Sequence, residues 1–368
     1  MIVVVNPQFY GVHGIARYLD SYLSNLPAAH MPVTLITGDE HKAPRSYAGV
    51  DIIDIPLVND RLSLTRWGLA ARKTILEIHR RSPVHCVNFH WPPLIPGLFL
   101  PKEIPLVLTA HTTYLGMSGR FYEPRRFEGQ WGATSLAIKM WMERRIFART
   151  SKVIALTEQG RQEVLQYGYS GPIAVIPNGA DTVKFQPDAS VEKDIDVLFS
   201  GRIEKRKGSV PMVALCKRLL EKRPGLRICI VGFGEDDAWV REQLAGLGDS
   251  VRMTGKVPFS EMVRYYARSH VYASTSYYEG LPGTCLEAMA MQLPAVVFDF
   301  LFYRGLVEPQ QTGLVFAPND IDAMSGGVLQ LLDQPELAAR MGRAGRALLE
   351  KDYAWKRLGA DVQGVLES

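Results

Sequence analysis

Two glutamates stand eight positions apart in the stretch TSYYEGLPGTCLEAMA, residues 275–290. Glu279 lies in a turn rich in glycine and proline, and Glu287 lies about one turn into the helix predicted after it. The turn keeps the two acids off a common helix face, but they can approach one ligand from two sides. The backbone N–H groups of Gly283 to Leu286 would face an anion, because a helix N-terminus favours negative charge.

A basic loop, SGRIEKRKGS at 200–209, follows a predicted strand and contains Arg202, Lys205, Arg206 and Lys207. An arginine can hold a phosphate through two parallel hydrogen bonds, whereas a lysine acts as a mobile point charge. Such a run is also typical of a solvated surface. Its place at the carboxyl end of a strand, where open α/β sheets bind ligands, favours a phosphate site.

Two other loops combine glycines with a following helix. Gly11 and Gly14 follow the first strand, where small residues either admit a phosphate to the helix start or form a tight turn. Gly232 and Gly234 form half of a dinucleotide fingerprint, but Asp237 stands where the third glycine belongs. No acid follows the next strand, so a nicotinamide cofactor is not favoured. The two glycines still allow a ligand to approach the backbone.

Histidines and acidic pairs are the remaining candidates for chemistry. His90 and His111 each follow a predicted strand, and His111, with two threonines after it, is the better functional candidate; packing is the alternative. Asp194 and Asp196 form a D-x-D pair of the kind that holds a divalent cation. Asp196 is the first residue of a buried strand, whereas ligands bind at the carboxyl ends of strands. No other cluster of acids, histidines and cysteines has the spacing of metal ligands. No metal site is predicted.

The bulk composition describes a globular protein of more than one core. The chain has 368 residues, 47% of them hydrophobic, so two domains are expected. Four cysteines without a C-x-x-C spacing indicate reduced thiols and a cytoplasmic protein. No apolar run is long enough to span a membrane. The net charge is +4, and the positive excess lies in residues 1–180. These charges either face an anionic lipid or an anionic acceptor, or are dispersed over a solvated surface.

Strand and helix patterns alternate along the whole chain. The predicted strands are 2–5, 33–37, 51–55, 84–89, 105–111, 152–157, 172–176, 196–201, 227–232, 251–255, 271–275, 294–298 and 313–316. Predicted helices between them include 15–26, 62–81, 239–246 and 261–268. This alternation predicts βαβ units in parallel sheets covered on both faces. A polar stretch at 177–195 predicts a linker, and hence two doubly wound α/β domains with a cleft between them.

Six segments in order resemble the retaining nucleotide-sugar glycosyltransferases of family 4, whose fold is called GT-B. EGLPGTCLEAMA is similar to the family's E-x7-E motif, and GRIEKRKG to its G-R-x4-K-G loop. VIPNGAD resembles its interdomain segment and HGIARYLDSYL its first loop and helix. The stretches ERRIFARTSKVIALTEQGRQEV and DYAWKRLGADVQGVL resemble the end of its N-terminal domain and its last helix. The resemblance covers nearly the whole chain.

The resemblance implies two Rossmann-like doubly wound domains that face a central cleft. The N-terminal, acceptor-side domain would span 1–180, and the donor-side domain 181–352. A C-terminal helix at about 353–368 would cross back to the N-terminal domain.

The resemblance also implies a role for each matching residue. Arg202 and Lys207 would hold the donor diphosphate. Glu287 would bind the ribose hydroxyls, and Glu279 would lie beside the transferred sugar. His111 would contact the sugar near the reacting carbon. The remaining donor contacts would be Gly14, His13, Gly232, Gly283, Thr284, Cys285 and Leu286. His13 departs from the family, because it stands where the first glycine of a pair is usual, which suggests that it contacts donor or acceptor.

The reaction implied is transfer of a hexosyl unit from a UDP-, GDP- or ADP-sugar to a hydroxyl, with retention of configuration. Fixed cations and helix N-termini would stabilise the departing diphosphate without a metal or other cofactor. The acceptor would be a glycan, glycolipid or lipid-linked sugar of bacterial exopolysaccharide or lipopolysaccharide assembly, and no nucleic acid is expected. The alternatives are another GT-B enzyme, such as a phosphorylase or nucleotide-sugar epimerase, and a non-catalytic nucleotide-sugar-binding module.

One segment suggests contact with a membrane. Residues 117–132, MSGRFYEPRRFEGQWG, mix four aromatic residues with three arginines. Aromatics among cations suit an interface with anionic lipid head groups, which would make the protein peripheral on the inner face of the cell membrane. The alternative is an acceptor loop packed on its own domain.

Overall fold

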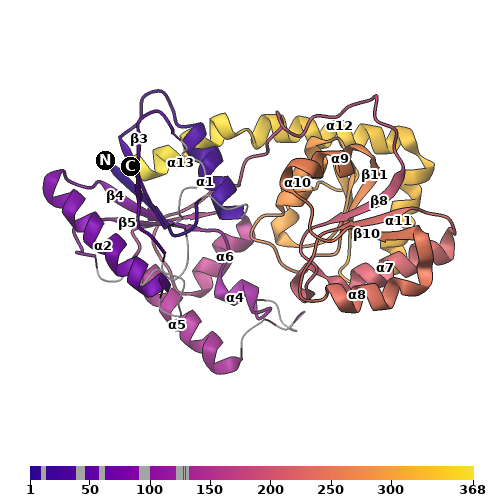
Figure 1. The fold of residues 1–368 in the computed structure, drawn as a ribbon, viewed down its shortest axis with the longest axis horizontal. Helices are drawn as coiled ribbons and strands as arrows, with labels where there is room; N and C mark the ends of the chain where they lie inside the picture. The colour runs from indigo at the N-terminus through magenta and orange to yellow at the C-terminus, as the bar shows by residue number, and fades with distance from the viewer. Residues whose placement is uncertain are drawn as a thin grey trace. The chain divides into compact units, whose positions relative to one another are not determined.

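The computed structural model describes residues 1–9, 14–38, 46–57, 63–90, 100–121, 127, 129 and 132–368. It divides into two compact units (Figure 1). Unit 1 consists of Met1–Phe121, Gln130–Gly179 and Trp355–Ser368, and unit 2 of Tyr122–Gly129 and Ala180–Ala354.

Unit 1 is built on a seven-stranded parallel sheet in the order β3-β2-β1-β4-β5-β6-β7. The strands are β1 Ile2–Asn6, β2 Val33–Thr37, β3 Val50–Asp54, β4 Cys86–Phe89, β5 Leu106–Ala110, β6 Lys152–Ala155 and β7 Ile173–Val175. Each predicted strand of this half is present. Every residue of β1, β2, β4 and β5 is buried, as a sheet covered on both faces requires.

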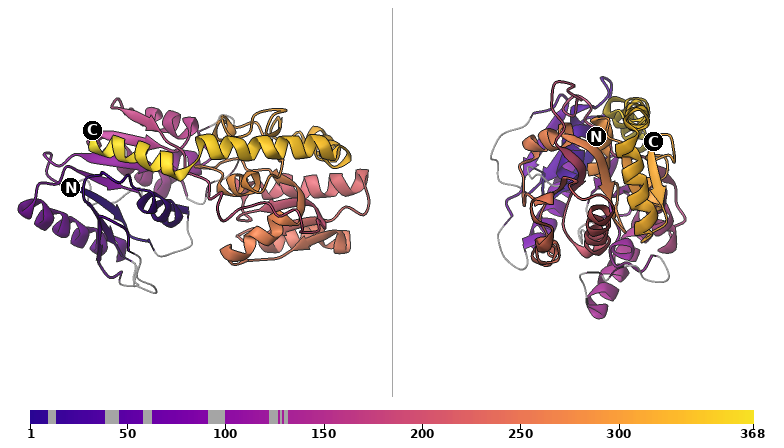
Figure 2. Two further views of the ribbon diagram at one scale, coloured as in Figure 1. Left: turned by 90° about the horizontal axis from the view of Figure 1, so that it is seen from above. Right: turned by 90° about the vertical axis from the view of Figure 1, so that its right-hand side faces the viewer.

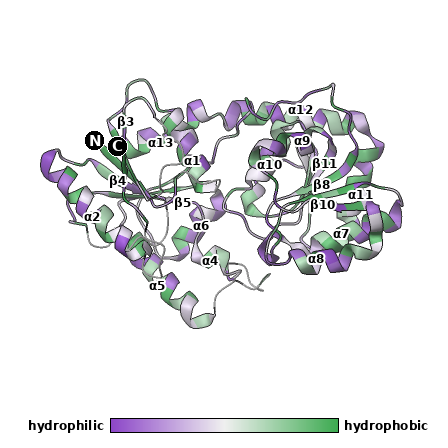
Figure 3. Cartoon of the chain, viewed as in Figure 1, coloured by the Kyte–Doolittle hydropathy of each residue, from purple (hydrophilic) through white to green (hydrophobic). Residues whose placement is uncertain are grey.

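The described part of unit 1 also contains helices. They are α1 Gly14–Ser24, α2 Ser63–Arg81, α4 Tyr114–Met117, α5 Ala133–Arg149, α6 Glu158–Gln166 and α13 Trp355–Glu367. Helices α1 and α2 begin where the apolar periodicity predicts. In Figure 3 the strands are apolar, while α2 and α5 mix apolar and polar residues, as helices with one buried stripe do.

Unit 2 repeats the design with a six-stranded parallel sheet in the order β10-β9-β8-β11-β12-β13. The strands are β8 Ile195–Ser200, β9 Ile228–Val231, β10 Val251–Met253, β11 Ser269–Ser274, β12 Ala295–Phe298 and β13 Gly313–Phe316. The predicted strands of this half are also all present. The order reverses direction between β8 and β11, and ligands of doubly wound sheets bind at such a switch point.

Unit 2 also contains helices of two kinds. The α-helices are α7 Ser209–Lys222, α8 Asp237–Leu244, α9 Met262–Ala267, α10 Gly283–Ala290, α11 Ile321–Asp333 and α12 Pro335–Asp352. The short 3₁₀ helices are η1 Lys205–Lys207, η2 Ala245–Ser250, η3 Phe259–Glu261 and η4 Leu301–Tyr303. The two sheets and their helices confirm the predicted α/β class with two doubly wound domains.

The last helix returns to unit 1, as expected. The chain leaves unit 2 after α12, and α13 packs with α1 (Figure 2). The Trp355 ring meets the Tyr18 ring edge-on at 5.2 Å between centroids. The Tyr22 hydroxyl donates to Oε1 of Gln363 at 2.6 Å. Burial of these aromatic rings and a satisfied buried hydroxyl hold α13 in place.

The predicted linker at 177–195 is only partly a linker. The junction between the units falls at Gly179 and Ala180, but Phe185 belongs to the core of unit 2. Its ring packs edge-on against Phe259 and Tyr266. The Arg346 guanidinium also donates to the carbonyls of Thr182 and Phe185, so the segment is anchored in a way that its polar composition did not indicate.

All four cysteines are free and buried. In the part of the chain that the structure describes, no helix is long and apolar enough to cross a bilayer.

Candidate functional site

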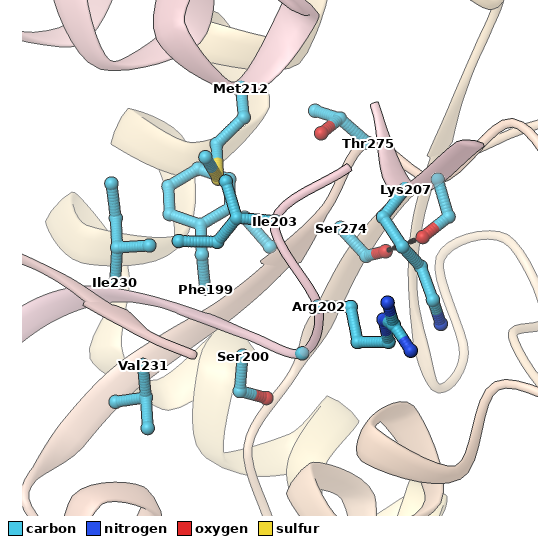
Figure 4. A pocket seen from close by; sticks show the side chains of 13 residues that line it. Phe199, Ser200, Arg202, Ile203, Lys207, Met212, Ile230, Val231, Ser274 and Thr275 are labelled. Atoms are coloured by element: carbon cyan, nitrogen blue, oxygen red, sulfur yellow. Dashed lines mark hydrogen bonds between the residues drawn. The ribbon is translucent and has the colours of Figure 1, made fainter. Parts of the chain in front are cut away.

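The loops after β8 and β11 meet at the switch point of unit 2. A pocket opens between them, floored by apolar side chains from β8, β9 and α7 (Figure 4). Its polar lining comes from Ser200 at the end of β8 and Arg202 after it, and from residues 274–276, which end β11 and begin the next loop. Lys207 lines it from the end of η1. In Figure 4 the side chains of Arg202 and Lys207 extend to the same side of this pocket.

Backbone contacts hold the two loops together. Gly208 ends η1 with a left-handed φ of 72°, and a Cβ there would lie 1.9 Å from the carbonyl oxygen of Thr275. The Thr275 hydroxyl donates to the Gly208 carbonyl at 2.9 Å. The amides of Tyr277 and Tyr278 donate to the carbonyl of Arg206 at 3.0 and 3.3 Å. Only a glycine permits this approach, which brings the side chain of residue 207 to the β11 loop.

Lys207 forms an ion pair with both carboxylate oxygens of Glu279. Both side chains are largely withdrawn from water, at 19% and 7% exposure. Ser276 donates a further hydrogen bond to Oε1 of Glu279 at 2.9 Å. Burial lowers the pKa of Lys207 and Arg206 adds to this, while Glu279 opposes it. The pair therefore places opposite charges, partly shielded from water, beside the pocket that Lys207 lines.

Arg202 and Arg206 share one buried acid. Nε of Arg202 lies 3.1 Å from Oε2 of Glu204, and Arg206 bonds to Oε1 of the same carboxylate. Arg206 also donates to the carbonyl of Tyr278 at 3.2 Å, so it braces the β11 loop. The Arg202 side chain stays 59% exposed and is the more accessible of the two guanidinium groups. In the basic loop, Arg206 therefore supports the β11 loop, whereas Arg202 is available to a ligand.

Glu287, in the second turn of α10, is buried beside the carboxyl end of β8. Its Oε2 accepts from the Tyr266 hydroxyl at 2.8 Å. The same hydroxyl lies 3.0 Å from Oγ of Ser200. Burial, and the negative charge of Glu287, raise the pKa of Tyr266, which keeps its hydroxyl a donor. Tyr266 thus orients Glu287 next to the pocket-lining Ser200.

Most of the amides at the start of α10 that were predicted to face an anion carry hydrogen bonds within the protein, and their contact with a donor stays a prediction. The amide of Gly283 donates to the Leu281 carbonyl, and those of Cys285 and Leu286 donate to the Pro282 carbonyl, at 2.9 to 3.2 Å. The first helical turn closes on Pro282, so these donors are already engaged. The Cys285 side chain is fully buried, and burial raises its pKa, so it faces the core rather than a ligand. The Thr284 hydroxyl lies 2.9 Å from that of Tyr272.

The glycines after β9 serve a backbone contact. A Cβ on Gly232 would lie 1.7 Å from the carbonyl oxygen of Gly201, and one on Gly234 would lie 2.2 Å from that of Ile203. This explains the glycines without a ligand. A donor contact by Gly232 stays a prediction. Gly283 and Gly14 meet no atom within 4 Å, so their lack of a side chain has no steric cause in the described residues.

The two predicted histidines are neighbours in unit 1, after β4 and β5. Nδ1 of His90 lies 3.1 Å from Nε2 of His111, and Nε2 of His90 lies 2.5 Å from Oδ1 of Asn88. The Tyr18 ring packs edge-on against His111 at 4.9 Å. Burial lowers the pKa of His111 to about 3 and that of His90 well below its usual value, so both rings are neutral. A neutral imidazole can position a hydroxyl but carries no charge. His13 lies outside the described residues.

The D-x-D pair is structural, as predicted. Asp194 accepts two hydrogen bonds from the Arg268 guanidinium, which lower its pKa. Asp196 accepts from the Arg227 amide at 2.7 Å and from its guanidinium. Among the described residues, no three histidine, cysteine, aspartate or glutamate side chains gather as a metal site requires.

Half of the predicted membrane segment lies outside the described residues. Of its aromatic residues, Phe127 is buried, with its ring 6.5 Å from that of Tyr278, so it does not face a lipid surface. Phe121 is partly buried, and Arg120 is exposed.

Several site residues were not predicted. They are Glu204, Tyr266, Ser274, Ser276 and Tyr303. Ser276 had a local cue, since it lies three positions before Glu279 in a loop already singled out. Tyr266 and Tyr303 had none, because they reach the site from separate elements, α9 and η4.

Two family models together account for most of the chain. The model described as Glycosyltransferase Family 4 matches residues 12–184, and the model described as Glycosyl transferases group 1 matches residues 181–348. The chain belongs to glycosyltransferase family 4. Its fold is GT-B, since solved glycosyltransferase structures of that fold superpose on nearly its whole length.

Individual relatives of this family 4 chain are distant. A GDP-mannose-dependent monoacylated alpha-(1-6)-phosphatidylinositol monomannoside mannosyltransferase of Corynebacterium glutamicum is 26% identical over 212 residues, which are 52% of this chain. The chain spans 55% of that relative's length. Sucrose-phosphate synthase of Thermosynechococcus elongatus superposes with a TM-score of 0.79 at 20% identity, covering 99% of this chain and 97% of its own. Anabaena HepE, solved with UDP and glucose, gives 0.76 at 15% identity, covering 99% and 98%.

Proposed function

We propose that the chain transfers a hexosyl unit from a nucleoside diphosphate sugar to a hydroxyl acceptor. The observation that carries this is the pairing of Lys207 with Glu279, beside Arg202, at the switch point of a family 4 glycosyltransferase. The mannosyltransferase relative depends on GDP-mannose by its name, and HepE was solved with UDP and glucose. Together they support a UDP- or GDP-sugar as donor, and the name of the mannosyltransferase supports a glycan or glycolipid as acceptor.

The mechanism rests on charge. Sugar transfer breaks the bond between the anomeric carbon and the diphosphate, which leaves with growing negative charge. Lys207 and Arg202 would bind that diphosphate and stabilise the charge as it develops. Glu279 would lie beside the transferred sugar. Glu287, oriented by Tyr266, would accept hydrogen bonds from the ribose hydroxyls.

We further propose that transfer retains the anomeric configuration and needs no metal. Two cations at the pocket can supply the positive charge that a divalent ion would otherwise bring. The leaving diphosphate oxygen would take the acceptor proton on the same face of the sugar. The neutral His111, in unit 1, would contact sugar hydroxyls by hydrogen bonds rather than by charge.

A donor screen tests the function. The purified protein is incubated with UDP-glucose, UDP-galactose, UDP-N-acetylglucosamine, GDP-mannose and ADP-glucose, and nucleoside diphosphate release is followed with and without simple glycoside acceptors. Release from one of these sugars is expected, with UDP or GDP binding by calorimetry. Binding without turnover would favour a non-catalytic module, and interconversion of sugars would favour an epimerase. No binding and no turnover would overturn the proposal.

The same assay tests the finer claims. Activity should survive EDTA, and the product anomer, read by proton NMR, should match that of the donor. Complete loss with EDTA, restored by Mn²⁺, would contradict metal independence. An inverted anomer would contradict retention.

A peripheral contact with anionic lipid is a second proposal, supported by α5 of unit 1. On this helix Ile138 and Trp141 are 54% and 58% exposed. The Arg145 guanidinium lies over the Trp141 ring at 5.3 Å, and Arg144 is also exposed. Apolar and aromatic side chains beside cations suit the boundary between lipid head groups and acyl chains.

Co-sedimentation with vesicles tests the contact. The protein should bind vesicles with a third of anionic phospholipid more strongly than neutral phosphatidylcholine vesicles. Trp141→Ala should weaken this binding, whereas Trp239→Ala, which removes an exposed tryptophan of unit 2, should not. Equal binding to both vesicles would overturn the proposal.

A further inference from the structure

A chain of hydroxyl groups runs through unit 2 to Glu279. The Tyr303 hydroxyl, in η4, donates to Oγ of Ser274 at 2.7 Å. Ser274 donates to Oγ of Ser276 at 3.2 Å, and Ser276 donates to Oε1 of Glu279 at 2.9 Å. All four side chains are buried. This chain of hydroxyl groups joins the segment after β12 to the loop after β11.

The carboxylate at its end gives the chain one direction. An ionised carboxylate only accepts hydrogen bonds, so Ser276 must donate to it, and each earlier hydroxyl must donate to the next. Burial above all, with smaller contributions from Tyr272, Cys285 and Glu279, raises the pKa of Tyr303, which keeps its proton for donation. Hydrogen bonds aligned in this way polarise and strengthen one another.

Glu279 is therefore held by two partners, Lys207 and Ser276. This inference rests on the proposed function, in which Lys207 binds the donor diphosphate. Its ion pair with Glu279 would then weaken. A buried carboxylate that loses its counter-charge is costly unless hydrogen bonds remain. The hydroxyl chain supplies such a bond from Ser276 to Oε1 of Glu279, and this bond does not depend on Lys207.

We propose that Tyr303 is a positioning residue which, through Ser274 and Ser276, holds the Glu279 carboxylate in place while Lys207 engages the donor diphosphate. Tyr303 is fully enclosed, with its ring 4.6 Å from that of Phe302, and does not line the pocket. It acts on the transferred sugar only through Glu279. Loss of its hydroxyl should therefore affect turnover of a nucleotide sugar but not binding of a nucleotide without the sugar.

Tyr303→Phe tests this, because it removes the hydroxyl and keeps the ring. With the donor that the wild type uses best, kcat/KM should fall about 3- to 10-fold, the scale of one hydrogen bond. The Kd for UDP or GDP, by calorimetry, should stay within twofold. Tyr353→Phe is the matched control, since it removes a buried hydroxyl that donates to the Gly305 carbonyl at 3.0 Å. It should leave kcat/KM within twofold.

A double variant separates positioning from general stability. In a Ser276→Ala background the chain is already cut, so adding Tyr303→Phe should change kcat/KM no further. Ser274→Ala, which cuts the same chain without touching a ring, replaces Tyr303→Phe if that variant does not fold. An unchanged kcat/KM in Tyr303→Phe, or an equal loss with and without Ser276, would overturn the proposal. An inactive wild type would instead contradict the proposed function.

Discussion

Lys207 and Glu279, 72 positions apart in the sequence, form a two-oxygen ion pair inside unit 2. Lys207 ends the loop after β8, and Glu279 lies in the loop after β11. These strands are neighbours at the switch point of the sheet, so their carboxyl ends deliver both side chains to one place. The pair joins the basic loop and the E-x7-E motif into one site.

Lys207→Ala removes the buried cation of this pair. We expect kcat/KM for the nucleotide sugar to fall by at least about 10²-fold, the scale of losing one group that stabilises a developing anion. Lys217→Ala, on the outer part of the following α7, serves as control and should stay near the wild type. Steady-state kinetics on both variants decide the matter. A loss below threefold in Lys207→Ala would remove this lysine from the mechanism.

Tyr266→Phe removes the hydroxyl that orients Glu287. Because ribose is bound equally before and during transfer, KM for the donor should rise about 3- to 10-fold with kcat nearly unchanged. Calorimetry should show the same loss of affinity for UDP or GDP. Tyr265→Phe, the adjacent residue on α9, is the control. A fall in kcat at constant KM would place Tyr266 elsewhere in the mechanism.

Gly208→Ala tests the contact between the two loops. Alanine at a φ of 72° is strained by about 1–2 kcal/mol, and its Cβ would overlap the Thr275 carbonyl. The free energy of unfolding should fall by at least about 2 kcal/mol in urea titrations. Gly326→Ala, on an exposed face of α11 with no atom within 4 Å, should instead gain about 0.5–1 kcal/mol. Equal effects of the two substitutions would contradict the steric account.

Glu143→Gln tests a buried acid of unit 1. Burial raises the pKa of Glu143 to about 8, and the negative charge of Glu163 adds to this rise. Hydrogen bonds from the Tyr167 hydroxyl and the Tyr114 amide lower the pKa and offset part of it. The folded pKa lies above the unfolded value, so this contribution to stability is complete below about pH 4.5 and is lost as pH rises toward 8. Glutamine stays neutral throughout.

The measurement is Tm between pH 5 and pH 8.5. The wild type should lose stability over this range relative to Glu143→Gln, on the order of 1 kcal/mol or more, which is about 2–4 °C for a unit of this size. Glu158→Gln, an acid at the exposed start of α6, is a suitable control and should follow the wild type. Parallel curves for wild type and Glu143→Gln would show that Glu143 is ionised throughout.

Much of the fold follows from local patterns in the chain. Every predicted strand is present, and most of them are short apolar runs of the kind that parallel sheets covered on both faces contain. The loops that carry Arg202, Lys207 and Glu279 follow such strands, so parallel pairing places them at one edge. Phe185 shows the limit of this reasoning, since a polar stretch hid one anchoring ring.

The sequence alone determined which loops carry the site, since strand ends and charged residue types are local properties. Only the tertiary structure decided which of the four cations in the basic loop pairs with Glu279. That choice depends on the left-handed turn at Gly208 and on the Tyr277 and Tyr278 amides bonding to Arg206. Tyr266 and Tyr303 likewise reach their carboxylates from separate elements. Such contacts depend on strand register and close backbone approach, and no spacing within one segment encodes either.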